Sequence, residues 1–124
     1  SPFTTLIFDL GIDSITNVSG VYEEDLDPTN NMYWTWQSGY INLKLEGYFE
    51  NRIYREYHLG GYAFPNNCLQ SITIPTSEND LKLFIHLDDF VNSIPDSFPF
   101  QVMTPMPKVK YITHLFAKTI SNEK

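Results

Sequence analysis

Residues Tyr40–Tyr48 alternate between apolar and polar side chains, and this alternation constrains the fold more than any other feature of the chain. The apolar positions are Ile41, Leu43 and Leu45, and the polar ones are Asn42, Lys44 and Glu46. A period of two is typical of a strand with one buried face. A polar turn over Phe49–Arg52 then precedes a second β-prone run, Ile53–Leu59, which ends at two glycines. The sequence therefore predicts an antiparallel hairpin.

Further strands are predicted from short β-prone runs that are bounded by turn formers. They cover Phe3–Ile12, Leu69–Ile74 and Leu81–Leu87. The apolar residues of the last run share one parity, so they would lie on one face of the strand. These residues are Leu81, Leu83, Ile85 and Leu87. Before the hairpin, Glu23–Asn31 combines acidic and amide residues with Pro28, which predicts an exposed, acidic loop.

Helical structure is predicted towards the C-terminus. Asp88–Ile94 fits one or two helical turns with Asp88 as the N-terminal cap. Pro95–Pro107 is rich in proline and should be irregular. After it, apolar residues recur at the spacing of an amphipathic helix, at Val109, Ile112, Leu115, Phe116 and Ile120. Because strands dominate, the expected fold is all-β, a β-sandwich of antiparallel strands with a short C-terminal helix, formed as one domain over residues 1–124.

Charge and composition exclude several classes of partner. Eight lysines and arginines against fifteen acidic residues give a net charge of -7, which repels phosphate backbones and anionic membrane surfaces. We therefore expect no nucleic-acid partner, and no apolar run approaches the length of about 20 residues that a membrane span needs. The lone Cys68 has no activating neighbour, and no nucleophile motif is present, so we expect no enzymatic activity.

Classical metal motifs are also missing from the sequence. The three histidines, His58, His86 and His114, are far apart, unlike the paired ligands of zinc motifs. The acidic loop fails the pattern of an EF-hand, because the sixth and twelfth positions lack the required glycine and glutamate. A different calcium site remains as an alternative to a solvated loop, with the ligands Glu23, Glu24, Asp25 and Asp27.

Both tryptophans lie directly before the alternating strand. Met32, Trp34 and Trp36 share one parity and would crowd one face. Aromatic residues of a small domain are typically core residues. A thioether and two indoles near a histidine also suit a soft metal such as Cu(I). Exposed aromatics would instead form a platform for a sugar or another flat ligand. The residues alone leave these three interpretations open.

The distance between the tryptophans and His58 depends on the register of the hairpin. With a tight turn at Phe49–Arg52, His58 would lie opposite Asn42, roughly 20 Å from Trp36 along a straight strand. Only a bend would bring the two closer, and glycine tolerates the backbone conformation of a bend. We therefore predict a break in the strand at Gly39.

Three segments resemble the MbnP-like family of bacterial proteins in their order and spacing. They read "LGIDSITN", "MYWTWQSGYINLKLEG" and "YHLGGY", and the resemblance covers Phe3–Tyr62. Its centre is the motif Met32-x-Trp34-x-Trp36-Gln37-Ser38-Gly39-Tyr40, followed by His58-Leu59-Gly60. The stretch Ile7–Gly20 and "DLDP" resemble the branch found in Bacteroidetes-type bacteria.

The resemblance implies a secreted, periplasmic or lipid-anchored bacterial β-sandwich protein, some of whose relatives bind copper. In such relatives a tryptophan can be oxidised to kynurenine, which joins the copper site, and a di-haem peroxidase relative is the modifying partner. Carried over by position, the metal site falls on Met32, Trp34, Trp36 and His58. Copper-type members show Asn-His where this chain has Asn17-Val18.

We therefore expect a non-enzymatic, exported copper-binding protein. The alternative is a cell-surface carbohydrate-binding or protein-interaction β-sandwich domain, in which the tryptophan motif is purely structural. Members of this family commonly carry an additional N-terminal β region. Because the chain begins at Ser1 without a methionine or a signal-like segment, we expect it to be the C-terminal part of a longer, processed or truncated protein. A lipid anchor would then lie ahead of Ser1.

Overall fold

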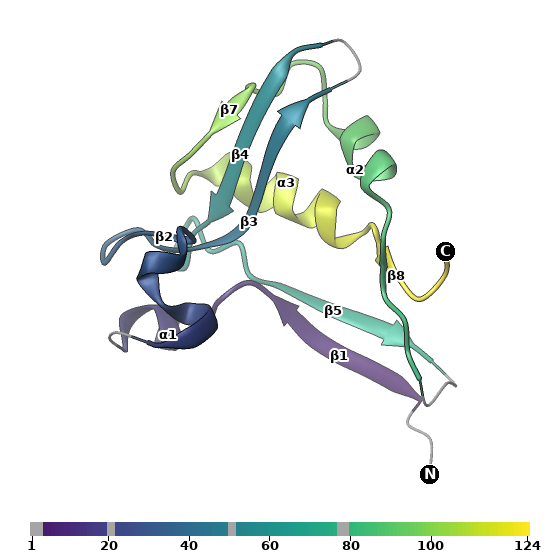
Figure 1. The fold of residues 1–124 in the computed structure, drawn as a ribbon, viewed down its shortest axis with the longest axis horizontal. Coiled ribbons are helices and arrows are strands. Elements are labelled where there is room, and N and C mark those ends of the chain that lie inside the picture. The colour runs from purple at the N-terminus through teal and green to yellow at the C-terminus, as the bar shows by residue number, and fades with distance from the viewer. Residues whose placement is uncertain (1–3, 20–21, 50–51, 77–79) are drawn as a thin grey trace.

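The computed structural model describes residues 4–19, 22–49, 52–76 and 80–124 (Figure 1). Its strands are β1 (Thr5–Leu10), β2 (Tyr33–Thr35), β3 (Gly39–Tyr48), β4 (Tyr54–Gly60), β5 (Gln70–Pro75), β6 (Phe84–Ile85), β7 (Gln101–Val102) and β8 (Ile120–Ser121). Its helices are α1 (Ser14–Val18), α2 (Leu87–Ser93) and α3 (Pro107–Ala117), with 3-10 turns η1 (Glu24–Leu26) and η2 (Pro28–Asn30).

Strands dominate this structure, and all but one of the pairings among its described strands are antiparallel. The main sheet has the order β2-β3-β4-β7, in which β7 runs parallel to β4. A second layer is the two-stranded β1–β5 ribbon, and β6 pairs with β8. Helix α3 contacts both β4 and β5, and Figure 1 shows it between the main sheet and the ribbon. The predicted fold class, with antiparallel strands and a short C-terminal helix, is confirmed.

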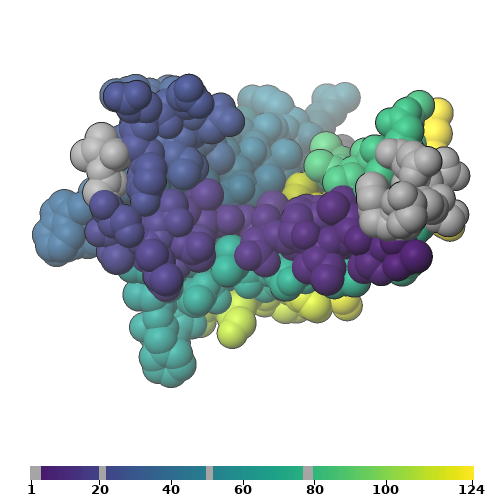
Figure 2. Space-filling model, turned by 90° about the horizontal axis from the view of Figure 1, so that it is seen from below, coloured from purple at the N-terminus to yellow at the C-terminus, as the bar shows by residue number. Residues whose placement is uncertain are grey.

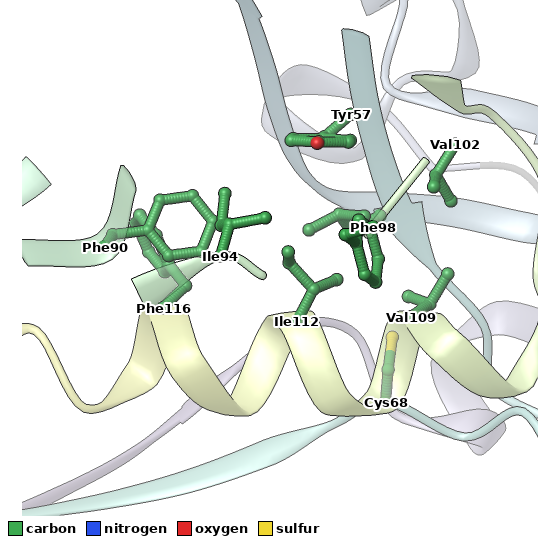
Figure 3. Packing of buried hydrophobic residues seen from close by; sticks show 10 residues of the cluster. Tyr57, Cys68, Phe90, Ile94, Phe98, Val102, Val109, Ile112 and Phe116 are labelled. Atoms are coloured by element: carbon green, nitrogen blue, oxygen red, sulfur yellow. The ribbon is translucent and has the colours of Figure 1, made fainter. Parts of the chain in front are cut away.

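The hydrophobic core lies where the inner face of the main sheet meets the helices. Figure 3 shows the apolar side chains of α3 pointing towards Tyr57 of β4 and Phe98. The rings of Phe90 and Phe116 meet edge to face at 5.2 Å, which joins α2 to α3. The Tyr57 hydroxyl donates a hydrogen bond to the Pro99 carbonyl at 2.9 Å, so this buried polar group is satisfied. The core therefore fixes one face of the hairpin and leaves the other face free to carry a site.

The predicted hairpin is confirmed, but its register differs from the expected one. Phe49 donates its backbone N–H to the Ile53 carbonyl, so the two residues close the turn. His58 therefore lies opposite Lys44 rather than opposite Asn42. Asn42 is the extra residue of an irregularity between Ile41 and Leu43. Residues 50–51 of the predicted turn lie outside the described part of the chain.

The strand predicted over Leu81–Leu87 is confirmed in part, but its apolar face is not buried. Only Phe84–Ile85 forms a strand, because β8 offers a partner for two residues alone. The alternate residues of the run point to solvent, and those more than a third exposed are Leu83, Ile85 and Leu87. Alternation predicts a buried face only when another layer covers that face, and none of the described elements does so here.

Two helix boundaries also differ from expectation. Helix α2 begins at Leu87 with His86 at the cap position, so Asp88 lies in the first turn instead of capping it. Its carboxylate there still interacts favourably with the helix dipole. Helix α3 ends at Ala117, and Ile120 belongs to β8. Among the described residues, no helix combines the length and apolar character that crossing a bilayer would require.

Candidate metal centre

The outer face of the β3–β4 hairpin gathers charged side chains. Successive residues of a strand point to opposite faces, so β4 sends Tyr57 and Leu59 into the core and Glu56 and His58 outwards. On β3, Glu46 lies directly opposite Glu56. The three outward side chains therefore meet on one face of two paired strands, which hold them more firmly than a loop would.

Glu46, Glu56 and His58 converge to metal-binding distances. One ligand atom from each lies within 4.8 Å of the other two. His58 Nε2 and Glu46 Oε1 are 2.5 Å apart. The His58 side chain is only 10% exposed, whereas that of Glu46 is 40% exposed, so the cluster opens to solvent on the carboxylate side. A cation could approach from that side without moving the backbone.

A second layer of contacts supports the cluster. Gln101 of β7 donates from Nε2 to Glu56 Oε1 at 3.1 Å, which fixes that carboxylate. Lys44 lies opposite His58, but its ammonium group donates to the Asn31 carbonyl at 2.8 Å instead. Within the described part of the chain, no lysine or arginine pairs with either carboxylate. Two glutamates opposite each other repel, and a bound cation would relieve that repulsion.

An imidazole and two carboxylates form a ligand set for divalent transition metals. Imidazole suits copper, zinc, nickel and iron, while carboxylates suit harder ions. For a given set of nitrogen and oxygen ligands, affinity among first-row divalent ions peaks at Cu²⁺. Of the ligands predicted from the sequence, only His58 belongs to this cluster, and Glu46 and Glu56 were missed.

Trp34 packs on the strand that carries His58. A Cβ atom built on Gly60 would lie 3.0 Å from Cζ3 of the Trp34 ring. Gly60 is two residues after His58 in β4, so its missing side chain would point to the same face. The indole therefore covers the position next to His58 along this face. Glycine is required at position 60, because a Cβ atom there would lie only 2.4 Å from the carbonyl oxygen of Tyr40.

Trp36 and Met32 have different surroundings from Trp34. Trp36 lies in the turn between β2 and β3 and is 76% exposed, so the two tryptophans do not crowd one face as their parity predicted. Met32 is half-buried directly before β2, and its carbonyl accepts a hydrogen bond from Ile41 N. Trp34 thus packs against β4, whereas most of the Trp36 side chain is exposed to solvent.

The predicted break at Gly39 is confirmed. Gly39 has φ +81°, in the region that favours glycine, and it starts β3 after the turn at residues 36–38. A Cβ atom at this position would collide with Asn17 Oδ1. Asn17, buried in α1, accepts a hydrogen bond from Tyr40 N at 2.9 Å. The tryptophan segment is thus folded back on β3 by a glycine and held there by α1.

Asn17 also donates two hydrogen bonds, to the carbonyls of Ile12 and Asp13 at 3.0 and 2.8 Å. Its neighbour Val18, at the position of the histidine in copper-type relatives, is 66% exposed. We expect Asn17→Ala to lower the free energy of unfolding by about 2–4 kcal/mol, because three hydrogen bonds are lost and Tyr40 N is left buried without a partner. Val18→Ala should change it by less than about 0.5 kcal/mol. Urea denaturation measures both, and equal midpoints for the two variants would refute the role of Asn17.

Among the residues that the structure describes, the other histidines and the acidic loop do not form a second centre. The carboxylates of the acidic loop do not converge, so a calcium site there lacks support among the described residues. Asp27 instead accepts hydrogen bonds from the backbone N–H and the hydroxyl of Thr29, which lowers the pKa of its carboxyl. His86 bonds to Ser121 and the Glu123 carbonyl, and His114 lies on α3 near Gln70.

Cys68 has the character of a core residue. It is fully buried, and this burial raises the pKa of its thiol. The sulfur lies 3.3 Å from Asn42 Nδ2, which donates to it. A protonated, enclosed thiol is neither a good nucleophile nor a metal ligand.

Comparison with known proteins assigns the family. The sequence model of the MbnP family matches residues 1–96, which include the tryptophan motif, Glu46, Glu56 and His58. No curated protein and no solved structure gives a significant match. The match covers well over half of the chain and extends beyond the motifs that suggested it. The chain therefore belongs to the MbnP family.

Proposed function

We propose that this chain is a non-enzymatic, exported protein that binds one divalent copper ion through Glu46, Glu56 and His58. The observation that carries the proposal is the convergence of these three side chains within 4.8 Å on a rigid hairpin. Membership of the MbnP family supports a link to copper. No lysine or arginine pairs with either carboxylate in the described part of the chain, which leaves negative charge for a cation to neutralise.

The ligand set favours Cu²⁺ over Cu⁺. Cu⁺ prefers thiolates and thioethers, and neither Cys68 nor Met32 belongs to the cluster. One imidazole and two carboxylates are harder ligands, which suit the divalent ion. The same set would also accept Zn²⁺, with an affinity below that of Cu²⁺ by the usual order of divalent ions.

Trp34 is the tryptophan that we propose as the neighbour of the metal. Its ring packs over Gly60, next to His58 on the same face. Modification of Trp34 by a di-haem peroxidase-type partner, which the family resemblance implies, would add a ligand to the three present. We also propose that the protein is exported to the periplasm or the cell surface, because the family resemblance implies it. Intact-mass measurement of protein from its native host tests the modification, and an unmodified Trp34 would refute it.

The proposal predicts one Cu²⁺ ion bound per metal-free chain. Isothermal titration at neutral pH should give a stoichiometry of one and tighter binding of Cu²⁺ than of Zn²⁺. Electron paramagnetic resonance should show coupling to the nitrogen of a single imidazole. Because the ligands must be deprotonated, affinity should fall as the pH is lowered. A copper spectrum without imidazole coupling would refute the site, and so would an unchanged spectrum of His58→Ala.

A further inference from the structure

Two loops at one end of the molecule present large aromatic side chains to solvent. Trp36, in the turn between β2 and β3, is 76% exposed, and Phe64, in the loop after β4, is 96% exposed. The loops are neighbours, since the Tyr62 hydroxyl donates to the Trp36 carbonyl at 3.5 Å. In Figure 2 the chain protrudes at this end in blue at the left and in teal below. Exposed aromatics on adjacent loops mark an interaction surface.

A hollow of about 210 Å³ lies between these loops. The polar residues that line it are Gln37, Ser38, Tyr62, Asn66 and Thr104. The lining contains no charged side chain, although the chain as a whole carries a net charge of -7. Asn66 lines the hollow, and its side-chain Oδ1 is buried without a hydrogen-bond partner among the described residues.

Both loops are held in place by their own hydrogen bonds. Ser38 N donates to Thr35 Oγ1 at 3.1 Å, and Asn66 N donates to the Ala63 carbonyl at 2.7 Å. At Gly61, with φ +146°, a side chain would collide with the Asn66 carbonyl. A ligand would therefore meet aromatic groups on an ordered backbone, and less conformational entropy would be lost on binding.

We propose that this hollow binds a neutral carbohydrate, with Phe64 of its lining and Trp36, which directly precedes the lining residue Gln37, as stacking surfaces and the amide and hydroxyl side chains as hydrogen-bonding partners. A sugar ring has an apolar face of C–H groups and an edge of hydroxyl groups, which match an aromatic ring and an uncharged polar lining. Because no cationic side chain lines the hollow, anionic ligands are disfavoured. The small volume of the hollow fits a single sugar ring. None of the lining residues belongs to the cluster of Glu46, Glu56 and His58.

Removal of either aromatic ring should weaken this binding while the fold stays intact. The probes are soluble neutral oligosaccharides of glucose, mannose and N-acetylglucosamine, titrated by calorimetry. We expect the wild-type chain to bind at least one of them, and Trp36→Ala and Phe64→Ala to weaken that binding at least about tenfold. Tyr48→Ala is the matched control, because Tyr48 is also 76% exposed but lies at the hairpin tip. It should leave the affinity unchanged.

Three outcomes would overturn the proposal. The first is that none of the three oligosaccharide series binds. The second is that Tyr48→Ala weakens binding as much as Trp36→Ala does. The third is that the wild-type chain binds vesicles of neutral phosphatidylcholine through Trp36 and Phe64 instead, which would make the two rings a membrane contact. Copper binding does not depend on these residues and should persist in every variant.

Discussion

Replacing His58 by alanine is expected to weaken Cu²⁺ binding by more than about 100-fold. Loss of a residue that only supports a metal ligand typically costs about 10–100-fold in affinity, and loss of a ligand should cost more. His58 supplies the only nitrogen ligand of the cluster, and its side chain is the least exposed of the cation-facing groups. Calorimetric titration of the metal-free variant with Cu²⁺ measures the change.

Matched variants separate the metal site from adventitious histidine binding and from loss of fold. His114→Ala removes an exposed histidine of α3 and should leave Cu²⁺ affinity unchanged. Glu56→Gln keeps the size of the side chain but removes its charge, so it should weaken Cu²⁺ binding without unfolding the chain. Circular dichroism of each metal-free variant verifies the fold. If His114→Ala lowered the Cu²⁺ affinity as much as His58→Ala did, the copper would not be bound at the hairpin.

The hairpin and its break could be predicted because both depend on local sequence. Alternation over Tyr40–Tyr48 specifies a strand with one apolar face. Glycine at position 39 permits the positive φ that the turn requires. Placement of the tryptophan segment against β4 then follows from this break together with the close approach at Gly60.

The metal cluster was missed because it depends on register. The sequence identified Glu46 as outward-facing and His58 as a site residue, but the expected register placed His58 opposite Asn42. The observed turn, closed by Phe49 and Ile53, brings Glu46 opposite Glu56. A shift of two residues keeps every side chain on its face, so the hydrophobic pattern could not distinguish the two registers. The length of the turn between β3 and β4 decides between the two registers, and the sequence pattern does not specify that length.

The error over Leu81–Leu87 has a different physical origin. Alternating leucines are compatible with a strand, but burial needs a second layer over that face. The chain places α2 directly after this run, and its buried residue, Phe90, supplies the core contact instead. The local sequence pattern therefore predicted the helix at α2 and the apolar character of the run. It did not predict that α2, and not the run, would pack against the core.

Replacing Phe90 by alanine is expected to lower the free energy of unfolding by about 3–5 kcal/mol. Phe90 is fully buried and joins α2 to α3 through its edge-to-face contact with Phe116. The variant loses the transfer free energy of the ring and leaves a cavity between two helices. Since a domain of this size has a net stability of about 5–15 kcal/mol, this loss is a large fraction of the total. Urea denaturation followed by circular dichroism measures it.

Leu87 provides the control on the same helix. It is apolar and of similar helix propensity to alanine, but it is 44% exposed, so Leu87→Ala should change the free energy of unfolding far less than Phe90→Ala. If both variants lost the same stability, α2 would be stabilised by its helical conformation and not by its contact with α3. The hairpin packs on the same core through Tyr57, so a folded Phe90→Ala chain with reduced Cu²⁺ affinity would show that core packing sets the geometry of the metal ligands.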